Sequence, residues 1–287
     1  MYQMEKVIVL GGDHRQYYLA DTLQKNGYHV CSYGVLMPEK NNIEWIKPDK
    51  VKQEIRESEM IVLPIPVSVD GKTIRQETAD DVLLLSELYD GIRAGQKIYG
   101  GILSEQLRSV CREKEAFCYD FMEDESVAVG NAVATAEGAV AEAILLGDET
   151  IHGKDCLVIG YGKCGAVLAD KLKGLQAKVT VMARNPVSRA KARSMGYEVR
   201  PMFSHQEVQT EKYTYLFNTV PTLVLTEQVL SGFDRSTVII DIASKPGGTD
   251  FEYCRYAGIR AKLALSLPGK YASRSSGEIL AQAIMNS

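Results

Sequence analysis

The sequence feature that most constrains the fold is a glycine pattern that directly follows a run of apolar residues. Residues 156–159 read Cys-Leu-Val-Ile, and Gly160, Gly162 and Gly165 follow them before the helical run 166–173. The first glycine allows a tight turn, the second lets the backbone approach a pyrophosphate, and the third permits close packing of helix against strand. This context predicts a strand, turn and helix that bind a dinucleotide. A tight turn without a ligand is the alternative.

Short apolar runs alternate with longer segments of helical periodicity along the chain. Strands that alternate with helices form parallel sheets with helices on both faces, because parallel neighbours need crossover connections. The length of 287 residues corresponds to about two domains. We therefore predict an α/β fold with two doubly wound, parallel-sheet, Rossmann-like domains. The expected strands are 7–10, 29–33, 60–63, 97–99 and 116–119 in the first domain, and 156–159, 179–182, 215–217, 238–240 and 260–264 in the second.

An apolar segment rich in alanine and valine separates the two groups of strands. Residues 123–146 are typical of one long helix or of a broken pair of helices. We expect the first domain to span residues 1–130 and the second to span 131–287, with the linking helix at its start. The tail 274–287 predicts a final helix that could pack back on the first domain.

Charge and cysteine usage restrict the possible partners and compartments. The chain has 33 basic and 37 acidic residues, so no global positive field attracts nucleic acid or an anionic membrane. No apolar run approaches the ~20 residues of a membrane span, and we expect neither a signal peptide nor an anchor. The six cysteines form no C-x-x-C pair and no cluster with zinc spacing. We expect reduced thiols, a cytoplasmic protein and no metal site.

The end of the strand after the glycines distinguishes between the two nicotinamide dinucleotides. An NAD site usually has an acidic residue about 20 residues beyond the glycines, whereas this sequence has no carboxylate between Lys171 and Tyr197. Ala183 lies at the expected position of the acid, and Arg184 follows it. A guanidinium suits a 2′-phosphate, so we predict NADP(H), with NAD(H) as the alternative. The basic residues further along this segment could equally form a solvated helix face.

Two later strand ends complete the expected cofactor site. Residues 218–221 and 241–248 follow strands of the second domain, and both stretches would face the nicotinamide half of a cofactor that lies along the strand ends. As loops they are unremarkable. The full set of expected cofactor contacts is Gly160, Tyr161, Gly162, Lys163, Cys164, Ala183, Arg184, Asn185, Arg189, Asn218, Thr219, Val220, Pro221, Ala243 and Ser244.

The first domain opens with a similar strand but a different turn. Residues 11–16 read Gly-Gly-Asp-His-Arg-Gln and lack the third glycine, which makes them a poor dinucleotide site. An arginine and a histidine at a strand end suit binding of an anionic substrate and proton transfer. We therefore assign this domain to the substrate, with His14 and Arg15 as candidate catalytic residues; a helix cap is the alternative for His14. Lys270 is a third candidate, as a cation for carboxylates.

Several motifs taken together resemble the A subunit of dipicolinate synthase. They are residues 11–16, 135–138, 150–153, 183–184, 218–221, 244–251 and 267–269. The resemblance implies a sporulation enzyme of Gram-positive bacteria, in the mother-cell cytoplasm, that oxidises dihydrodipicolinate to pyridine-2,6-dicarboxylate with NAD(P)+. The two-domain architecture is also similar to that of 2-hydroxyacid dehydrogenases, alanine dehydrogenase and adenosylhomocysteinase. This sequence departs from the family at Ser266, where glycine is expected, and at His14, where alanine is more usual.

The resemblance also implies the partners of the chain. A small dicarboxylate substrate calls for cations, which Arg15, Lys270 and Arg274 could supply, and a separate flavoprotein-like B subunit completes the enzyme. We further expect a homo-oligomer. Two alternatives remain open: an NADP-dependent dehydrogenase of another small 2-hydroxy or 2-amino carboxylate, and a non-catalytic Rossmann scaffold subunit.

Overall fold

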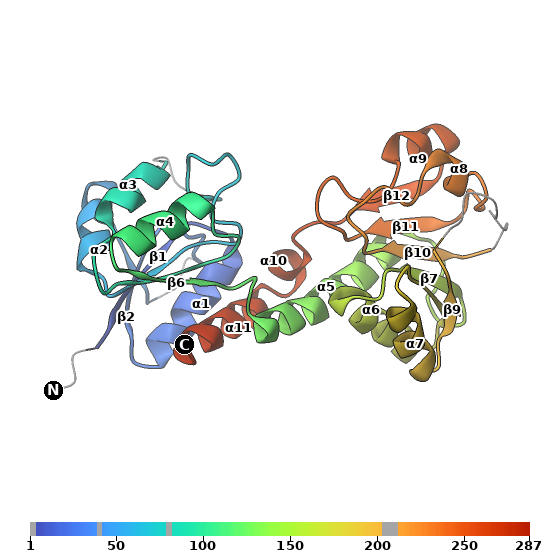
Figure 1. Cartoon of the computed structure of the whole chain (residues 1–287), viewed down its shortest axis with the longest axis horizontal. Helices are drawn as coiled ribbons and strands as arrows, with labels where there is room; N and C mark the ends of the chain where they lie inside the picture. Colours follow the sequence, from blue (N-terminus) through green and yellow to red (C-terminus); the bar gives the residue numbers. More distant parts are fainter. Residues whose placement is uncertain (1–3, 39–41, 79–81, 203–211) are drawn as a thin grey trace. The chain divides into compact units, whose positions relative to one another are not determined.

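The computed structural model describes residues 4–38, 42–78, 82–202 and 212–287, and the chain divides into two compact units (Figure 1). The first unit comprises residues 1–130 and 272–287, and the second comprises 131–271. The chain therefore returns to the first unit at Ala272; we assigned the final helix to the second domain, 131–287, while expecting that it could pack back on the first. The cause is the final helix, whose Gly277 lies directly against the backbone of the first helix of the chain, near Arg15 and Leu19.

The first unit is built on a six-stranded, fully parallel sheet with strand order β3-β2-β1-β4-β5-β6. Its strands are β1 (Lys6–Leu10), β2 (His29–Tyr33), β3 (Glu44–Trp45), β4 (Met60–Val62), β5 (Lys97–Gly100) and β6 (Phe117–Asp120). Its helices are α1 (His14–Lys25), the 3₁₀ turn η1 (Pro48–Lys50), α2 (Val51–Glu57), α3 (Leu85–Gly91), α4 (Glu105–Glu113), the first residues of α5 (Glu125–Leu146), and α11 (Ser273–Met285).

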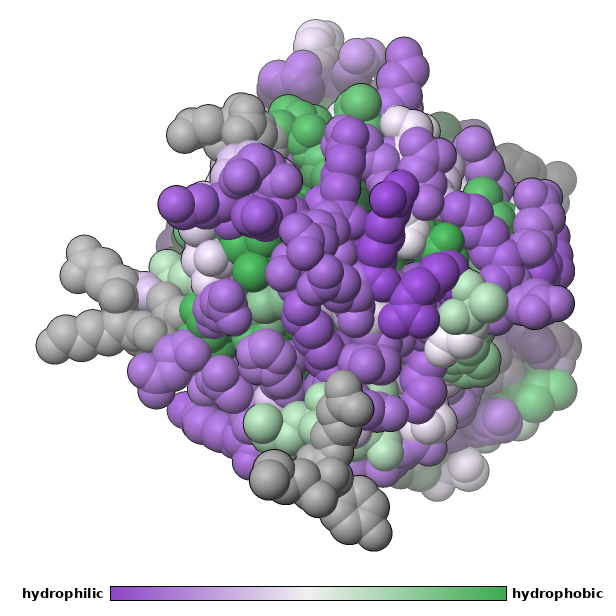
Figure 2. Space-filling model, turned by 90° about the vertical axis from the view of Figure 1, so that its left-hand side faces the viewer, coloured by the Kyte–Doolittle hydropathy of each residue, from purple (hydrophilic) through white to green (hydrophobic). Residues whose placement is uncertain are grey.

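Both faces of this sheet are buried because its strands are apolar on both sides. Ile8 and Leu10 of β1 pack on one face with α2, α3 and α4, while Val7 and Val9 pack on the other with α1 and α11 (Figure 1). This alternation follows from the period of two residues in a strand. On the face that Figure 2 shows, hydrophilic residues dominate and hydrophobic ones lie scattered among them.

The second unit repeats the architecture, with strand order β12-β11-β10-β7-β8-β9 and parallel pairing throughout. Its strands are β7 (Asp155–Ile159), β8 (Lys178–Met182), β9 (Glu198–Arg200), β10 (Tyr215–Asn218), β11 (Val238–Asp241) and β12 (Arg260–Leu263). The helices α6 (Lys163–Gly174), α7 (Pro186–Ser194) and α10 (Leu267–Tyr271) pack on one face with the later part of α5, and α8 (Glu227–Leu230) and α9 (Phe251–Ala257) pack on the other.

Helix α5 is one unbroken helix of 22 residues that begins in the first unit and ends in the second. By length and mean hydropathy it would suffice for a membrane span, and 39% of its most apolar stretch is buried. Its alanines at positions 136, 139 and 143 pack into the core of the second unit, and its Glu142 forms ion pairs there. These contacts are those of a core helix.

The predicted fold class is confirmed: both units are doubly wound parallel sheets in Rossmann strand order. Every strand expected from the sequence is present. Two short edge strands, β3 and β9, were not expected, because neither has a run of buried residues long enough to show a period.

Candidate dinucleotide-binding site

The turn between β7 and α6 admits glycine alone at two positions. Gly160 has φ +94°, and a Cβ there would lie 2.2 Å from Thr219 Oγ1. A Cβ at Gly165 would lie 2.2 Å from the carbonyl oxygen of Gly160. The Gly160 N–H donates to Met182 O at 2.8 Å, which ties the turn to the end of β8. Strand, turn and helix are therefore packed as tightly as backbone atoms permit.

Gly162 differs from its two neighbours in the motif because a Cβ there would meet no atom within 4 Å. It is the N-cap residue of α6 and is exposed, and no side chain caps this helix. Helix N-termini attract anions through their unpaired N–H groups and the helix dipole. An open, uncapped helix end beside a closed turn fits the pyrophosphate of a dinucleotide.

Three side chains of this motif surround the turn. Lys163 is exposed at the first position of α6. Tyr161 is half-buried, with its ring edge-on to that of Tyr197 at 6.1 Å between centroids. Burial raises the pKa of the Cys164 thiol, which favours the less nucleophilic, protonated form.

The loop after β8 carries a cationic side chain, Arg184, that is not paired with any described residue. Ala183 is buried, whereas Arg184 is exposed, and its guanidinium makes no hydrogen bond or ion pair with any residue that the structure describes. Asn185 caps α7 by accepting a hydrogen bond from the Val187 N–H at 2.8 Å. Arg189 donates to the carbonyl oxygens of Ala183 (2.9 Å) and Arg184 (2.6 Å). Arg189 and Asn185 therefore hold the loop, and the guanidinium of Arg184 remains available to a ligand.

The ends of β10 and β11 are held together by two fully buried polar residues. Asp241 Oδ2 accepts from Asn218 Nδ2 (3.0 Å), Gly248 N (2.8 Å) and Thr249 Oγ1 (2.7 Å), while its Oδ1 accepts from Ala243 N (3.0 Å). Asn218 also exchanges hydrogen bonds with the backbone of Val220. These bonds fix both loops before any ligand arrives.

The remaining expected cofactor contacts lie on the same two loops. Thr219 donates through Oγ1 to Ile159 O at 2.9 Å, so it forms the floor beneath Gly160. Val220 is half-buried beside it, whereas Pro221 and Ser244 are exposed. The structure thus brings 160–165, 183–185, 218–221 and 243–244 to the carboxyl edge of one sheet. Asn218 contributes through its side-chain hydrogen bonds to Asp241 and to the Val220 backbone, and Ala243 contributes through its backbone N–H.

In the turn between β1 and α1, the side chain of Asp13 occupies the helix N-terminus that is left open at Gly162 in the second unit. Asp13 is the N-cap residue of α1, and its Oδ1 accepts from the Arg15 N–H. The Arg15 guanidinium donates to both carboxylate oxygens (2.8 and 2.7 Å) and to Ile65 O (3.1 Å). Burial alone would raise the pKa of Asp13, but the bonds and charge of Arg15, aided by Arg75, lower it below its ordinary value.

The three candidate catalytic residues differ in their availability. His14 is exposed at the first position of α1. Arg15 is only 5% exposed, so its guanidinium is engaged inside the unit rather than presented to a substrate as we expected. Lys270 lies in the second unit, and its Nζ is 2.6 Å from Glu142 Oε1, with half of its side chain exposed.

Glu142 is the partner of the candidate Lys270, and sequence reasoning missed this pairing. Its side chain is 2% exposed and also contacts Lys262 Nζ at 2.6 Å. Burial opposes its ionisation, yet the hydrogen bonds from the two lysines lower its pKa to about 2. The sequence signal for Glu142 was an isolated carboxylate in an alanine-rich helix.

Ser266, just before α10, has φ +56°, which explains why glycine is expected there.

Asp241 is the second missed residue. It ends the buried run Val-Ile-Ile-Asp of β11, and a carboxylate at the end of such a strand must find several donors. The four donors come from the end of β10 and from the loop after β11, and they make Asp241 a positioning residue for the candidate site.

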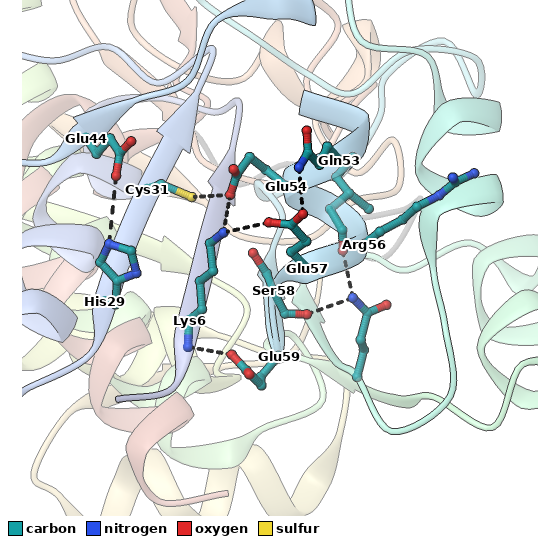
Figure 3. Close-up of polar contacts among 12 residues, drawn as sticks. Lys6, His29, Cys31, Glu44, Gln53, Glu54, Arg56, Glu57, Ser58 and Glu59 are labelled. Carbon is teal, nitrogen blue, oxygen red and sulfur yellow. Dashed lines mark hydrogen bonds and ion pairs between the residues drawn. The ribbon is translucent and has the colours of Figure 1, made fainter. Parts of the chain in front are cut away.

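A second polar cluster lies at the amino ends of the strands in the first unit (Figure 3). Lys6 Nζ contacts Glu54 Oε2 (2.6 Å) and Glu57 Oε2 (3.4 Å), and Cys31 Sγ lies 3.8 Å from the same Glu54 oxygen. Burial raises the pKa of Cys31 to about 12, so this thiol is unreactive. The cluster fastens α2 to β1 and β2. Within the described ranges, no group of His, Cys, Asp or Glu side chains is placed to hold a metal ion.

Two parallel sheets in Rossmann order, one with a complete glycine turn, define the fold class of nicotinamide-nucleotide-linked dehydrogenases. The crystal structure of a transhydrogenase from Sinorhizobium meliloti shares this fold. Its TM-score is 0.67 at 14% identity, and the match covers 98% of this chain and 92% of that chain.

More similar proteins define the family within this class. The dipicolinate synthase A subunit of Bacillus subtilis (strain 168) is 30% identical over 288 residues, which cover 97% of this chain and 94% of the relative. The crystal structure of the dipicolinate synthase A subunit from Bacillus halodurans has a TM-score of 0.87 at 29% identity, covering 99% and 98% of the two chains. The family model for the N-terminal domain of the dipicolinate synthase A subunit matches residues 6–122. The chain belongs to the family of dipicolinate synthase A subunits, which confirms the resemblance seen in its motifs.

Proposed function

We propose that this chain is an oxidoreductase subunit that oxidises dihydrodipicolinate to pyridine-2,6-dicarboxylate with NADP+ as the hydride acceptor. One observation carries the proposal: the β7–α6 turn is closed to side chains at Gly160 and Gly165 but open at Gly162, where the helix end is uncapped. That shape suits a dinucleotide pyrophosphate. The activity for which the similar proteins are named supports the substrate class.

The loop after β8 supports NADP+ over NAD+. Ala183 offers no carboxylate to a ribose 2′-hydroxyl, and the Arg184 guanidinium is exposed without a partner among the described residues. A carboxylate at position 183 would repel a 2′-phosphate, whereas a guanidinium binds it with charge-assisted hydrogen bonds. NAD+ remains the alternative, and the two are separated by direct titration.

The proposed reaction removes two hydrogens from the dihydropyridine ring. The electron pair of one C–H bond leaves with its hydrogen as hydride, the second hydrogen leaves as a proton, and the ring becomes aromatic. When bound, NADP+ supplies the acceptor for that hydride. The chain supplies binding and orientation: residues 160–165 hold the phosphates, and the loops 218–221 and 243–244, fixed by Asp241, hold the nicotinamide.

The first unit is the substrate domain in this proposal. His14 is its candidate proton acceptor, because it is exposed at the start of α1, after the turn that follows β1. Arg15 is assigned to holding the β1–α1 turn, since its donors already bind Asp13 and Ile65. Lys270 remains a candidate for a substrate carboxylate, because half of its side chain is exposed.

The proposed setting follows from the family. The relatives are named as one of the subunits of their enzyme, which supports a partner chain. That partner is a flavoprotein-like B subunit in the cytoplasm of a sporulating cell. Co-purification with that partner and light scattering of the isolated chain test the complex and the expected homo-oligomer.

The cofactor site is tested by Gly162→Ala. Gly162 has φ −84° and ψ −163°, which alanine adopts without strain, so the fold should be unchanged. The new methyl group would enter the space assigned to the pyrophosphate and weaken NADPH binding roughly tenfold or more. Gly174→Ala on the same helix is the matched control, because its Cβ would also meet nothing within 4 Å. Equal NADPH affinities of both variants in calorimetric titrations would refute the site.

The reaction is tested with the purified chain, dihydrodipicolinate and NADP+. We expect NADPH and pyridine-2,6-dicarboxylate to appear in equal amounts, measured by absorbance and chromatography. Turnover of a 2-hydroxy or 2-amino acid in place of dihydrodipicolinate would indicate the first alternative. Turnover by the isolated chain, without the B subunit, would exclude the scaffold alternative, in which the partner carries out the redox step.

A further inference from the structure

The loop after β11 presents a lysine that no role described so far uses. Lys245 is exposed, four residues beyond the end of β11. We propose that Lys245 binds one carboxylate of the dicarboxylate substrate and so determines specificity for a doubly charged ring. This inference rests on the proposed function and adds a binding residue to the same site.

The backbone that carries Lys245 is fixed in place. Lys245 lies within a turn closed by a hydrogen bond from Gly247 N to Ser244 O at 2.9 Å. Both sides of this turn are held by the buried Asp241 carboxylate, through Ala243 N and Gly248 N. Gly248 also packs against the neighbouring loop so closely that a Cβ there would lie 2.4 Å from Val220 O. A rigid base lowers the entropy lost when a side chain engages a ligand.

Lys245 also differs from the cations expected to bind the substrate, because its side chain has no partner among the described residues. The structure gives its side chain no hydrogen bond and no ion pair with any residue in the described ranges, whereas Arg15 is paired with Asp13 and Lys270 with Glu142. Its neighbour Asp241 is fully buried and already accepts four hydrogen bonds. The positive charge of Lys245 is therefore not neutralised within its loop.

The sheet order places Lys245 at the correct end of the site for a substrate. Arg184 follows β8 and Lys245 follows β11, and β7 and β10 lie between these strands. Three strand spacings of about 4.8 Å therefore separate the two strand ends. The adenosine phosphate is assigned to Arg184 and the pyrophosphate to the turn after β7. The nicotinamide, and the ring that reacts with it, then belong over β10 and β11, beside Lys245.

The test compares Lys245→Gln with the wild-type chain and with Lys178→Gln. Lys178 is an exposed lysine at the opposite, amino end of β8, so its variant controls for loss of one surface charge. NADPH-saturated protein is titrated with pyridine-2,6-dicarboxylate by calorimetry. We expect Lys245→Gln to weaken binding about tenfold to a hundredfold, as loss of a charge-assisted hydrogen bond does, and Lys178→Gln to leave it unchanged.

Three further measurements make the outcome decisive. Lys245→Arg should restore most of the affinity, and pyridine-2-carboxylate should lose less affinity than the dicarboxylate on Lys245→Gln. In turnover assays Lys245→Gln should raise the KM for dihydrodipicolinate more than it lowers kcat. Absence of NADPH binding in the wild-type chain would overturn the proposed function. Unchanged dicarboxylate affinity in a Lys245→Gln protein that still binds NADPH would overturn this inference alone.

Discussion

Each sheet begins with a strand–turn–helix segment, and the two segments have a similar backbone arrangement. They differ in the group that neutralises the N-terminal end of the helix. Gly11 N donates to Tyr33 O at the end of β2, and Gly160 N donates to Met182 O at the end of β8, each at 2.8 Å. The N-cap residue that follows is Asp13 in the first unit and Gly162 in the second.

This difference separates a structural turn from a ligand-binding one. In the first unit a carboxylate of the chain itself occupies the helix end, with Arg15 and Arg75 as its counter-ions. In the second unit the helix end is open and uncapped, and the nearby Arg184 guanidinium has no partner within the described part of the chain. In the same fold, the positive N-terminal end of the helix is therefore either neutralised by a carboxylate of the chain or left open to an anion from solution.

The largest effect is expected on removing the internal anion. Asp13→Ala would leave the buried Arg15 guanidinium without its carboxylate and should destabilise the first unit by about 3–5 kcal/mol. Urea unfolding followed by circular dichroism measures this loss. Asp21→Ala, which breaks an exposed ion pair with Lys25 on the same helix, should cost less than about 1 kcal/mol. Similar losses in both variants would contradict the structural role of Asp13.

A smaller loss of stability is expected at the closed point of the other turn. Gly165→Ala places a methyl group 2.2 Å from the carbonyl oxygen of Gly160 and 3.0 Å from its carbonyl carbon, and these backbone atoms resist displacement. We expect a destabilisation of about 1–3 kcal/mol in thermal or urea unfolding. Gly174→Ala near the end of α6 should be neutral or stabilising by up to about 1 kcal/mol. A Gly165→Ala protein as stable as that control would show that the turn is looser than described.

Arg184→Asp tests whether the open turn of the second unit binds the phosphorylated cofactor selectively. The substitution replaces a cation by an anion beside the site assigned to the 2′-phosphate, so NADPH affinity should fall about tenfold to a hundredfold. NADH affinity should change much less, because NADH lacks that phosphate. Arg193→Asp on the exposed face of α7 serves as the control. Parallel losses for NADPH and NADH on Arg184→Asp would remove the basis for cofactor selectivity.

The smallest effect is expected from the pH dependence of Glu142. Its pKa is about 2 in the folded chain against an ordinary value of 4.5, so its ion pairs stabilise the second unit above about pH 4.5. That contribution is lost as the pH falls from 4.5 towards 2. The two lysines are about half exposed, and water weakens the pairs.

Melting temperatures of the wild-type chain and Glu142→Gln measure this contribution. Their difference should shrink over that pH range. Glu137→Gln, which affects a more exposed pair with Lys171, is the control. A difference that stays constant with pH would assign the effect of Glu142 to packing alone.

Much of the fold could be predicted because strands buried on both faces leave a strong signal in the sequence. Runs such as 7–10 and 156–159 are apolar throughout, and the glycine spacing marks the turn that follows the second run. The edge strands β3 and β9 could not be predicted, since two or three partly exposed residues carry no periodicity.

The partners of charged side chains were harder to predict than the elements that carry them. Arg15 and Asp13 are close in the sequence, but the second acceptor of the Arg15 guanidinium, Ile65 O, is 50 residues away. Lys270 and Glu142 are 128 residues apart, so nothing in the sequence around Lys270 indicates that it is paired. A cation can be recognised in a sequence, whereas its availability depends on the folded chain.

The carboxylate at the start of α1 has a consequence for how the molecule responds to its cofactor. Asp13 is part of the chain, so its carboxylate is present at every nucleotide concentration. The rigidity of the first sheet therefore does not depend on the cofactor. In the proposed function the second sheet acquires its anion by mass action, which adds about 2.7 kcal/mol when NADP(H) is at a hundred times its Kd. Amide hydrogen exchange should then slow with cofactor in the second sheet and stay constant in the first, so that one half of the chain reports the nucleotide supply.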